Sequence, residues 1–132
     1  MNTELQQFKI LTEKLDRIDD AVISAADKFA EYLTSGRDGI KLTTSQLRKF
    51  YGEVKHMQLN GYDDSDNSEF KLLKPKLAYA VGRRQNKDNK IKDFYEIISS
   101  AIDQVHNKTD FDNFIKMFEA IVAYHKYHEN KN

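Results

Sequence analysis

The sequence predicts an all-α protein, a compact bundle of about five helices that forms a single domain over residues 1–132. Three observations support this prediction. The 132 residues include one Pro and five Gly and are rich in Lys, Glu, Leu and Ile, which favours helix over strand. Apolar residues recur at steps of three and four, the periodicity of amphipathic helices. The length is sufficient to bury one core without disulfide or metal support.

The first helix is expected over residues 3–35. Thr3 could cap its start and Gly36 its end. Its apolar residues recur at steps of three and four and form a narrow seam along one side of the helix. Such a seam packs along one partner, either a helix of the same chain, which we favour, or a neighbouring subunit. The positions of the seam are Phe8, Leu11, Leu15, Ile18, Val22, Ala25, Phe29 and Tyr32.

The second helix should run from Thr43 to about Asn60, because Thr43 and Gln46 have the spacing of a capping box. The stretch 61–68, GYDDSDNS, is polar and should be a loop. It lacks the Gly and Glu that a calcium loop needs at its sixth and twelfth positions, so we interpret its acids as solvated. The apolar positions of the helix are Leu47, Phe50, Tyr51, Val54 and Met57.

Three further helices follow. Pro75 disfavours helical geometry at the preceding residue but fits a first helical turn, so a short turn at 69–73 should precede a helix that starts at Pro75. A kinked continuous helix is the alternative. The fifth helix should begin near Thr109 or Asp110. The apolar positions are Ile91, Phe94, Tyr95, Ile98, Ile102 and Val105 in the fourth helix, and Phe111, Phe114, Ile115, Phe118, Ile121, Val122 and Tyr124 in the fifth.

The sequence contains few of the residues that catalysis requires. His125 and His128 are three apart but lack a third ligand at suitable spacing, and we expect them at a frayed terminus. Glu119 lies in an apolar run, and we interpret it as an ion-paired carboxylate rather than a general base. No phosphate-binding glycine loop is present. We therefore expect no enzyme, no metal site and no cofactor.

The cellular location is expected to be the cytoplasm. The chain contains no Cys, which fits a reducing compartment. Its first residues mix Glu4, Lys9 and Glu13 among apolar side chains, so they resemble neither a signal peptide nor a membrane span.

Charge is distributed unevenly along the chain, although its net value is zero. Residues 41–92 contain 12 Lys and Arg against 6 Asp and Glu, a balance of +6. Residues 1–40 contain 5 positive and 8 negative side chains, and residues 93–132 contain 4 and 7. A basic middle third of this kind can bind a polyanion even when the net charge suggests no such partner.

Part of the positive charge falls on one face of the second helix. At about 100° per residue, the side opposite the apolar positions carries Arg48, Lys49, Gly52, Lys55 and His56. Glycine is unfavourable inside a helix, so Gly52 between cations suggests that a backbone, such as a phosphate chain, comes close there. A tolerated glycine on a solvated face is the alternative.

The third helix repeats the arrangement with Lys76, Tyr79 and Arg83, and Arg84 follows. Residues 71–92 contain eight Lys and Arg against one acid, whereas solvated faces usually mix signs. Tyr79 could stack on a base or ribose, although half-buried packing is the commoner use of one Tyr. Because no pattern of base-reading side chains is evident, we expect binding to a nucleic-acid backbone without sequence preference.

Three strings resemble the small α-helical subunit of type III-A CRISPR effector complexes, the Csm complexes. They are LTTSQLRKFYGEVK at 42–55, LLKPKLAYAVGR at 72–83 and FEAIVAYHKY at 118–127. They occur in the expected order, and the resemblance covers residues 40–128. The first helix carries no such motif.

The resemblance implies a non-catalytic subunit of antiviral RNA-guided interference that stacks in more than one copy. Its implied partners are guide RNA, target RNA, the repeated backbone subunit, the large signalling subunit and further copies of itself. The RNA contacts that it implies are Arg48, Lys49, Lys76 and Arg83. To these we add Lys55 and Arg84 from helical geometry and the charge count. Glu119 could pair with an Arg of the second or third helix.

Two other functions compete with this interpretation. A DNA-binding regulator with a helix-turn-helix would place residues 43–60 in the major groove. The eight-residue loop 61–68 is longer than the usual turn of that motif, which argues against it. A helical adaptor that binds only protein through the first seam would leave the basic faces unexplained.

Overall fold

The computed structural model describes residues 4–13, 15–36, 40–83 and 90–131. Within these ranges the only strand-like pairing is an isolated bridge between Asp63 and Asp66. The predicted all-α class is confirmed, and the described residues form six α-helices and one 3-10 helix instead of about five helices. The elements are η1 (Leu5–Thr12), α1 (Asp20–Thr34), α2 (Thr44–Asn60), α3 (Ser68–Lys71), α4 (Leu73–Gly82), α5 (Lys90–Ile102) and α6 (Lys108–Lys131).

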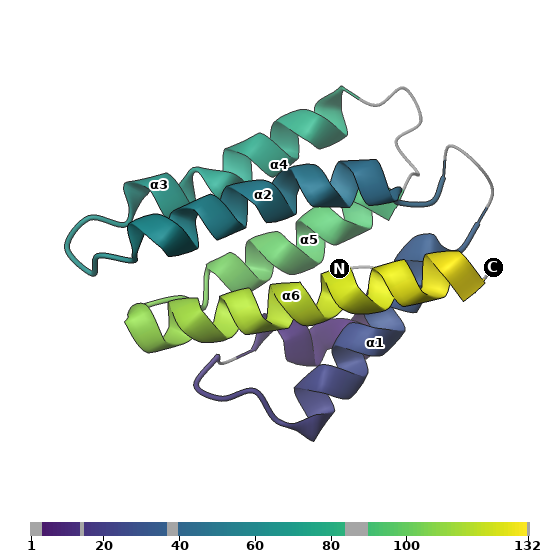
Figure 1. Ribbon diagram of the computed structural model, residues 1–132, viewed down its shortest axis with the longest axis horizontal. Helices are drawn as coiled ribbons and strands as arrows, with labels where there is room; N and C mark the ends of the chain where they lie inside the picture. The colour runs from purple at the N-terminus through teal and green to yellow at the C-terminus, as the bar shows by residue number, and fades with distance from the viewer. Residues whose placement is uncertain (1–3, 14, 37–39, 84–89, 132) are drawn as a thin grey trace.

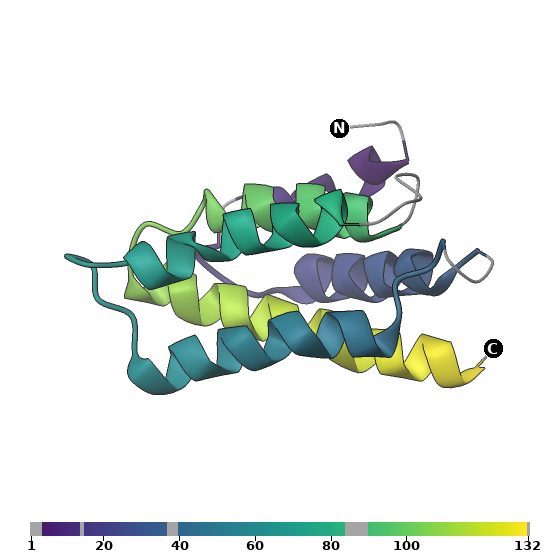
Figure 2. The same ribbon diagram turned by 90° about the horizontal axis from the view of Figure 1, so that it is seen from above.

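The helices form two layers around a shared hydrophobic core (Figures 1 and 2). In one layer the long helix α6 runs between α2 and α1 and packs against both. In the other layer α5 packs against both η1 and α4. The aromatic rings of Phe29, Phe94, Phe114 and Phe118 are fully buried between the elements. Since burying one such side chain contributes about 1.5–3 kcal/mol, these rings are a major source of cohesion between the layers.

The first segment differs from the single helix predicted over residues 3–35. η1 and α1 are separate, and the described residues between them are not helical, so the continuous helix is wrong. Competing hydrogen bonds explain the break. The Asp19 carboxylate accepts from the Val22 amide at 3.0 Å and caps α1. The Leu15 carbonyl accepts at 2.6 Å from the side chain of Asn113 on α6.

The apolar seam of that segment is nevertheless used inside the chain. η1 packs against α1 and α5, and α1 packs against α6. The intramolecular interpretation is therefore confirmed, and a protein-binding adaptor would not have this seam available. The buried seam positions are Phe8, Leu11, Leu15, Val22, Ala25 and Phe29, while Ile18 and Tyr32 are partly buried against the core.

The start of α2 follows the prediction. The Thr43 hydroxyl accepts from the Gln46 amide at 3.2 Å, and the Gln46 side chain accepts from the Thr43 amide at 2.9 Å, which completes the capping box. At the other end Gly61 has φ +82°, a conformation that glycine adopts without strain. α2 is thus fixed at both ends by the residues that the sequence singles out.

The starts of α4 and α6 differ slightly from the predictions. α4 begins at Leu73, directly after the short helix α3, so Pro75 lies in its first turn. α6 begins after Asn107, whose side-chain oxygen accepts from the Asp110 amide at 2.9 Å. α6 therefore starts one or two residues before the predicted start near Thr109 or Asp110, because Asn107 acts as its cap.

His125 and His128 lie on the buried side of α6, so the expected frayed terminus is wrong. The Nε2–H of His125 donates to the carbonyl of Leu42 at 2.8 Å, and Nε2 of His128 lies 2.6 Å from Oδ1 of Asp27. Both rings therefore join α6 to other parts of the fold. Across the described ranges, no three His, Cys, Asp or Glu side chains cluster as a metal ion would require. None of the helices described has the length and apolarity needed to cross a bilayer.

Candidate nucleic-acid interface

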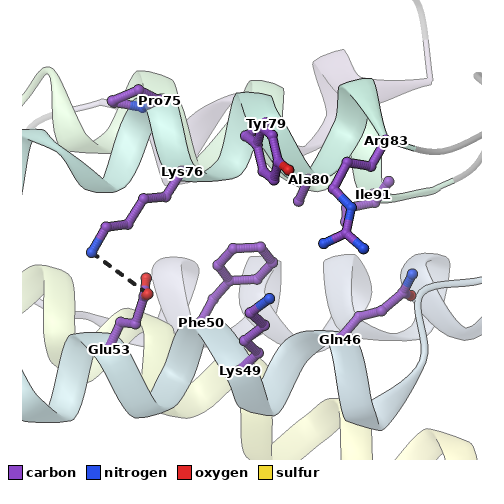
Figure 3. Close-up of a pocket in the computed structure, with 10 residues that line it drawn as sticks. All are labelled: Gln46, Lys49, Phe50, Glu53, Pro75, Lys76, Tyr79, Ala80, Arg83 and Ile91. Carbon is purple, nitrogen blue, oxygen red and sulfur yellow. Dashed lines mark ion pairs between the residues drawn. The ribbon is translucent and has the colours of Figure 1, made fainter.

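A groove of about 550 Å³ lies between α2 and α4 (Figure 3). It exists because α2 packs against α6 while α4 packs against α5, in the other layer, so the two helices flank the groove without closing it. Its apolar lining includes Phe50 from α2, Ala80 from α4 and Ile91 from α5. Phe50 and Ile91 are themselves buried in the core, so the base of the groove is continuous with the hydrophobic interior.

Polar side chains line the groove from both helices. Lys49 and Glu53 project from α2, Lys76 and Tyr79 project from α4, and Arg83 directly follows α4 (Figure 3). Helical spacing explains this, because residues three or four apart lie on the same face of a helix. The lining contains three cations and one carboxylate and is therefore positive overall.

Two contacts organise these side chains. Nζ of Lys76 lies 3.6 Å from Oε1 of Glu53, which joins α4 to α2 across the groove (Figure 3). The guanidinium of Arg83 lies 5.6 Å from the centre of the Tyr79 ring, at cation–π distance. Tyr79 is 68% exposed, so the half-buried packing that is commoner for a single tyrosine does not occur.

The groove separates the predicted RNA-binding residues into groups. Lys49, Lys76 and Arg83 line it together. Arg48 is exposed but does not line the groove. Arg84 lies outside the described residues.

Lys55 is turned toward α6. Its Nζ lies 3.3 Å from Oε1 of Glu119, and the two side chains are 42% and 41% exposed. The partner of Glu119 is thus a lysine rather than the expected arginine. The interpretation of Glu119 as an ion-paired carboxylate is confirmed. Lys55 differs from Lys49, Lys76 and Arg83 because its carboxylate partner lies on α6, away from the groove.

Gly52 is exposed on α2, and a Cβ atom added there would meet no atom within 4 Å. The described residues therefore give no steric reason for a glycine at this position. The two interpretations of Gly52, close approach of an external backbone and a tolerated solvated glycine, both stay predictions.

Some cations of the basic run 71–92 contact other groups of the same chain. Nζ of Lys71 donates to the carbonyls of Ile102 and Val105 at 3.3 and 3.4 Å. Nζ of Lys74 lies 2.6 Å from Oδ1 of Asp103, near the end of α5. The charge count alone therefore overstates the number of cations that can face an anionic ligand.

Lys90 is another cation of this run that contacts the fold, since its Nζ lies 3.5 Å from the centre of the Tyr32 ring. Among the described residues, Lys49, Lys76 and Arg83 are the cations that line the α2–α4 groove. Their shared position in this groove separates them from Lys71, Lys74 and Lys90, which contact other parts of the fold.

Sequence reasoning missed Glu53 and Gln46, which also line the groove. Among the described residues, Oε2 of Glu53 is buried without a hydrogen-bond partner, although Oε1 faces Lys76. The available signal was the four-residue step from Lys49 to Glu53, which places both on one helical face. The position of α4 opposite that face could not be read from spacing within α2.

The sequence matches the Csm2 Type III-A family over residues 6–131. The chain belongs to the type III-A Csm2 family. A relative from Enterococcus italicus, named CRISPR system Cms protein Csm2, is 32% identical over 97 residues, which cover 66% of this chain and 68% of the relative. No solved structure matches the chain.

Membership of the Csm2 family confirms the resemblance to the small Csm subunit. It also extends that resemblance, since the match begins at residue 6 and includes η1 and α1, which carry no recognisable motif. The Csm2 match does not favour the helix-turn-helix regulator. In the structure, the groove side of α2 faces α4, and its opposite flank contacts α6 through Lys55.

Proposed function

We propose that the protein is a non-catalytic small subunit of a type III-A CRISPR complex that binds guide and target RNA through their backbone, independently of sequence. It acts in the cytoplasm beside other Csm subunits and packs in more than one copy along the complex. The observation that carries the proposal is the convergence of Lys49, Lys76 and Arg83 on the α2–α4 groove of a Csm2 family member.

Physical chemistry supports backbone binding. A subunit that serves any guide sequence should bind phosphates and leave sequence recognition to base pairing. Lys49 and Arg83 are exposed, so they can exchange contacts with solvent ions for contacts with phosphates. A weak contact in each copy becomes strong when several copies bind one RNA.

The test is charge reversal in the groove. The double variant Lys49→Glu, Arg83→Glu is preferable to changes at Lys76 or Lys55, because those two lysines have carboxylate partners within the fold. We expect weaker binding to guide–target duplexes of any sequence. The slope of log affinity against log salt should become shallower by about 1.5, the amount expected for two lost phosphate contacts.

The matched control is Lys28→Glu, Lys116→Glu, which makes the same charge change at exposed positions of α1 and α6. Circular dichroism should show equal helix content in both double variants. Equal RNA affinity of the two variants would show that the groove is not the RNA site. Tight, sequence-selective binding of duplex DNA by the wild-type protein would favour the regulator instead.

A further inference from the structure

We propose that the α2–α4 groove holds one unstacked nucleotide of the bound RNA, with its base against Tyr79 and its phosphate at Lys49 and Arg83. This inference rests on the proposed RNA-binding function. It extends that function, because contact with a phosphate chain alone would require neither an aromatic ring nor an apolar surface.

Tyr79 is the first reason. It is among the most exposed large apolar side chains of the described residues, at 68%, and it stands beside a groove rather than on a flat surface. Successive bases of single-stranded RNA stack on such rings, and any base can do so because every base has a π face. Arg83 lies 5.6 Å from the ring centre and so places a cation next to a stacked nucleotide.

The shape and lining of the groove are the second reason. Its volume of about 550 Å³ lies within the range of about 300–1,000 Å³ typical of small-ligand sites. The apolar surface of Phe50, Ala80 and Ile91 suits the face of a base, and the cations suit its phosphate. Few ligand classes combine a flat apolar ring with a negative charge, and a nucleotide is one of them.

Glu53 is the third reason. Its Oε2 atom is buried and finds no hydrogen-bond donor in the part of the chain that the structure describes, while Nζ of Lys76 lies 3.6 Å from Oε1. A carboxylate repels a phosphate, so its place among three cations argues against a groove built for phosphates alone. Every RNA base carries at least one N–H donor on its Watson–Crick edge, and Glu53 could accept from any of them. The site would therefore tolerate all bases.

The experiment is an NMR titration of the full chain, which detects even weak binding. The two probes are a short oligouridine and an abasic ribose-phosphate chain of equal length. We expect the wild-type protein to bind the oligouridine about tenfold more tightly, as expected for one base stacked on an aromatic ring. The ring-proton signals of Tyr79 should move upfield with the oligouridine only.

Variants at Tyr79 identify the ring involved. Tyr79→Leu should abolish the preference for the oligouridine, whereas Tyr79→Phe should keep it. Tyr127→Leu is the matched control, since Tyr127 is also exposed, at 59%, but lies on α6 outside the groove. It should leave the preference unchanged.

Glu53→Gln tests whether the Glu53 carboxylate contacts the base or only repels the phosphates. If the groove bound phosphates alone, removing the carboxylate would tighten both probes equally. We expect it instead to tighten the abasic chain and to lower the preference for the oligouridine.

The outcomes distinguish this inference from the proposed function. Equal affinity of the wild-type protein for both probes, or a preference that survives Tyr79→Leu, overturns the nucleotide site and leaves backbone binding intact. A Tyr79→Leu variant that binds both probes normally but loses other Csm subunits would assign the groove to a protein side chain, which also overturns the inference. Failure to bind either probe overturns the nucleotide site and the proposed function together.

Discussion

Nζ of Lys55 on α2 lies 3.3 Å from Oε1 of Glu119 on α6, and this ion pair joins two helices of the same layer. On a helical projection Lys55 belongs to the same basic face as Arg48 and Lys49. In the folded chain it is instead held by α6. The pair therefore separates a structural cation from the cations available to an anionic ligand.

We expect Lys55→Ala to weaken RNA binding less than Lys49→Ala. Both side chains of the pair are partly exposed, so its loss should lower the free energy of unfolding by no more than about 1 kcal/mol. Urea denaturation measures the stability, and titration with a guide–target duplex measures the affinity. Equal losses of affinity in the two variants would show that Lys55 leaves Glu119 when RNA binds.

This pair also shows how far sequence reasoning extends. Helical periodicity correctly identified the buried side of α2, including Leu47, Phe50 and Val54. It could not predict which helices lie beside the polar side of α2. The helix beside Lys49 and the helix beside Lys55 are determined by long-range packing. Glu53 was missed for the same reason, since its importance arises from the position of α4 across the groove.

Gly52→Ala should raise the free energy of unfolding by about 0.5–1 kcal/mol, because alanine is the better helix former and the added Cβ meets no atom within 4 Å. If a phosphate backbone passes over this position, the same variant should bind RNA several-fold more weakly despite its higher stability. Thermal unfolding and duplex titration test the two parts separately. Higher stability with unchanged affinity would identify Gly52 as a tolerated glycine on a solvated face.

Asn113→Ala should lower the free energy of unfolding by about 1–3 kcal/mol. The Asn113 side chain is 8% exposed and donates at 2.6 Å to the carbonyl of Leu15, which would lose its donor in a mostly buried site. Hydrogen exchange should accelerate in the connection between η1 and α1. Asn60→Ala, at an exposed position of α2, is the control and should change stability by less than about 0.5 kcal/mol. Similar effects in the two variants would contradict a structural role for the Asn113 bond.

The same bond explains why the start of the chain was predicted least well. The seam from Phe8 to Phe29 identified the buried positions, because side chains follow the core whether or not one helix carries them. One of the two hydrogen bonds at the break joins Asn113 to Leu15, residues 98 positions apart. Local periodicity contains no information about such a partner, whereas the capping box at Thr43 is local and was predicted correctly.

The phenol of Tyr32 gives a prediction for alkaline pH. Its hydroxyl lies 2.5 Å from Oδ2 of Asp93 on α5 and 3.1 Å from Oε2 of Glu4, next to η1. Burial is the main cause that raises the Tyr32 pKa above its ordinary value of 10.0, and the two carboxylates add to it. The folded protein therefore holds this proton more tightly than the unfolded chain does. The resulting stability is present below about pH 10 and is lost as the pH rises above that value.

Tyr32→Phe removes this proton and its hydrogen bonds. At neutral pH the variant should be less stable than the wild type by about 1 kcal/mol, the usual net value of such a bond. As the pH rises above about 10, the wild type should lose stability faster, so that the two unfolding free energies converge. Urea denaturation at a series of pH values measures both curves. Asp93→Asn keeps the phenol but removes one carboxylate, so its decline should be intermediate, whereas parallel curves for all three proteins would show that Tyr32 ionisation is not linked to folding.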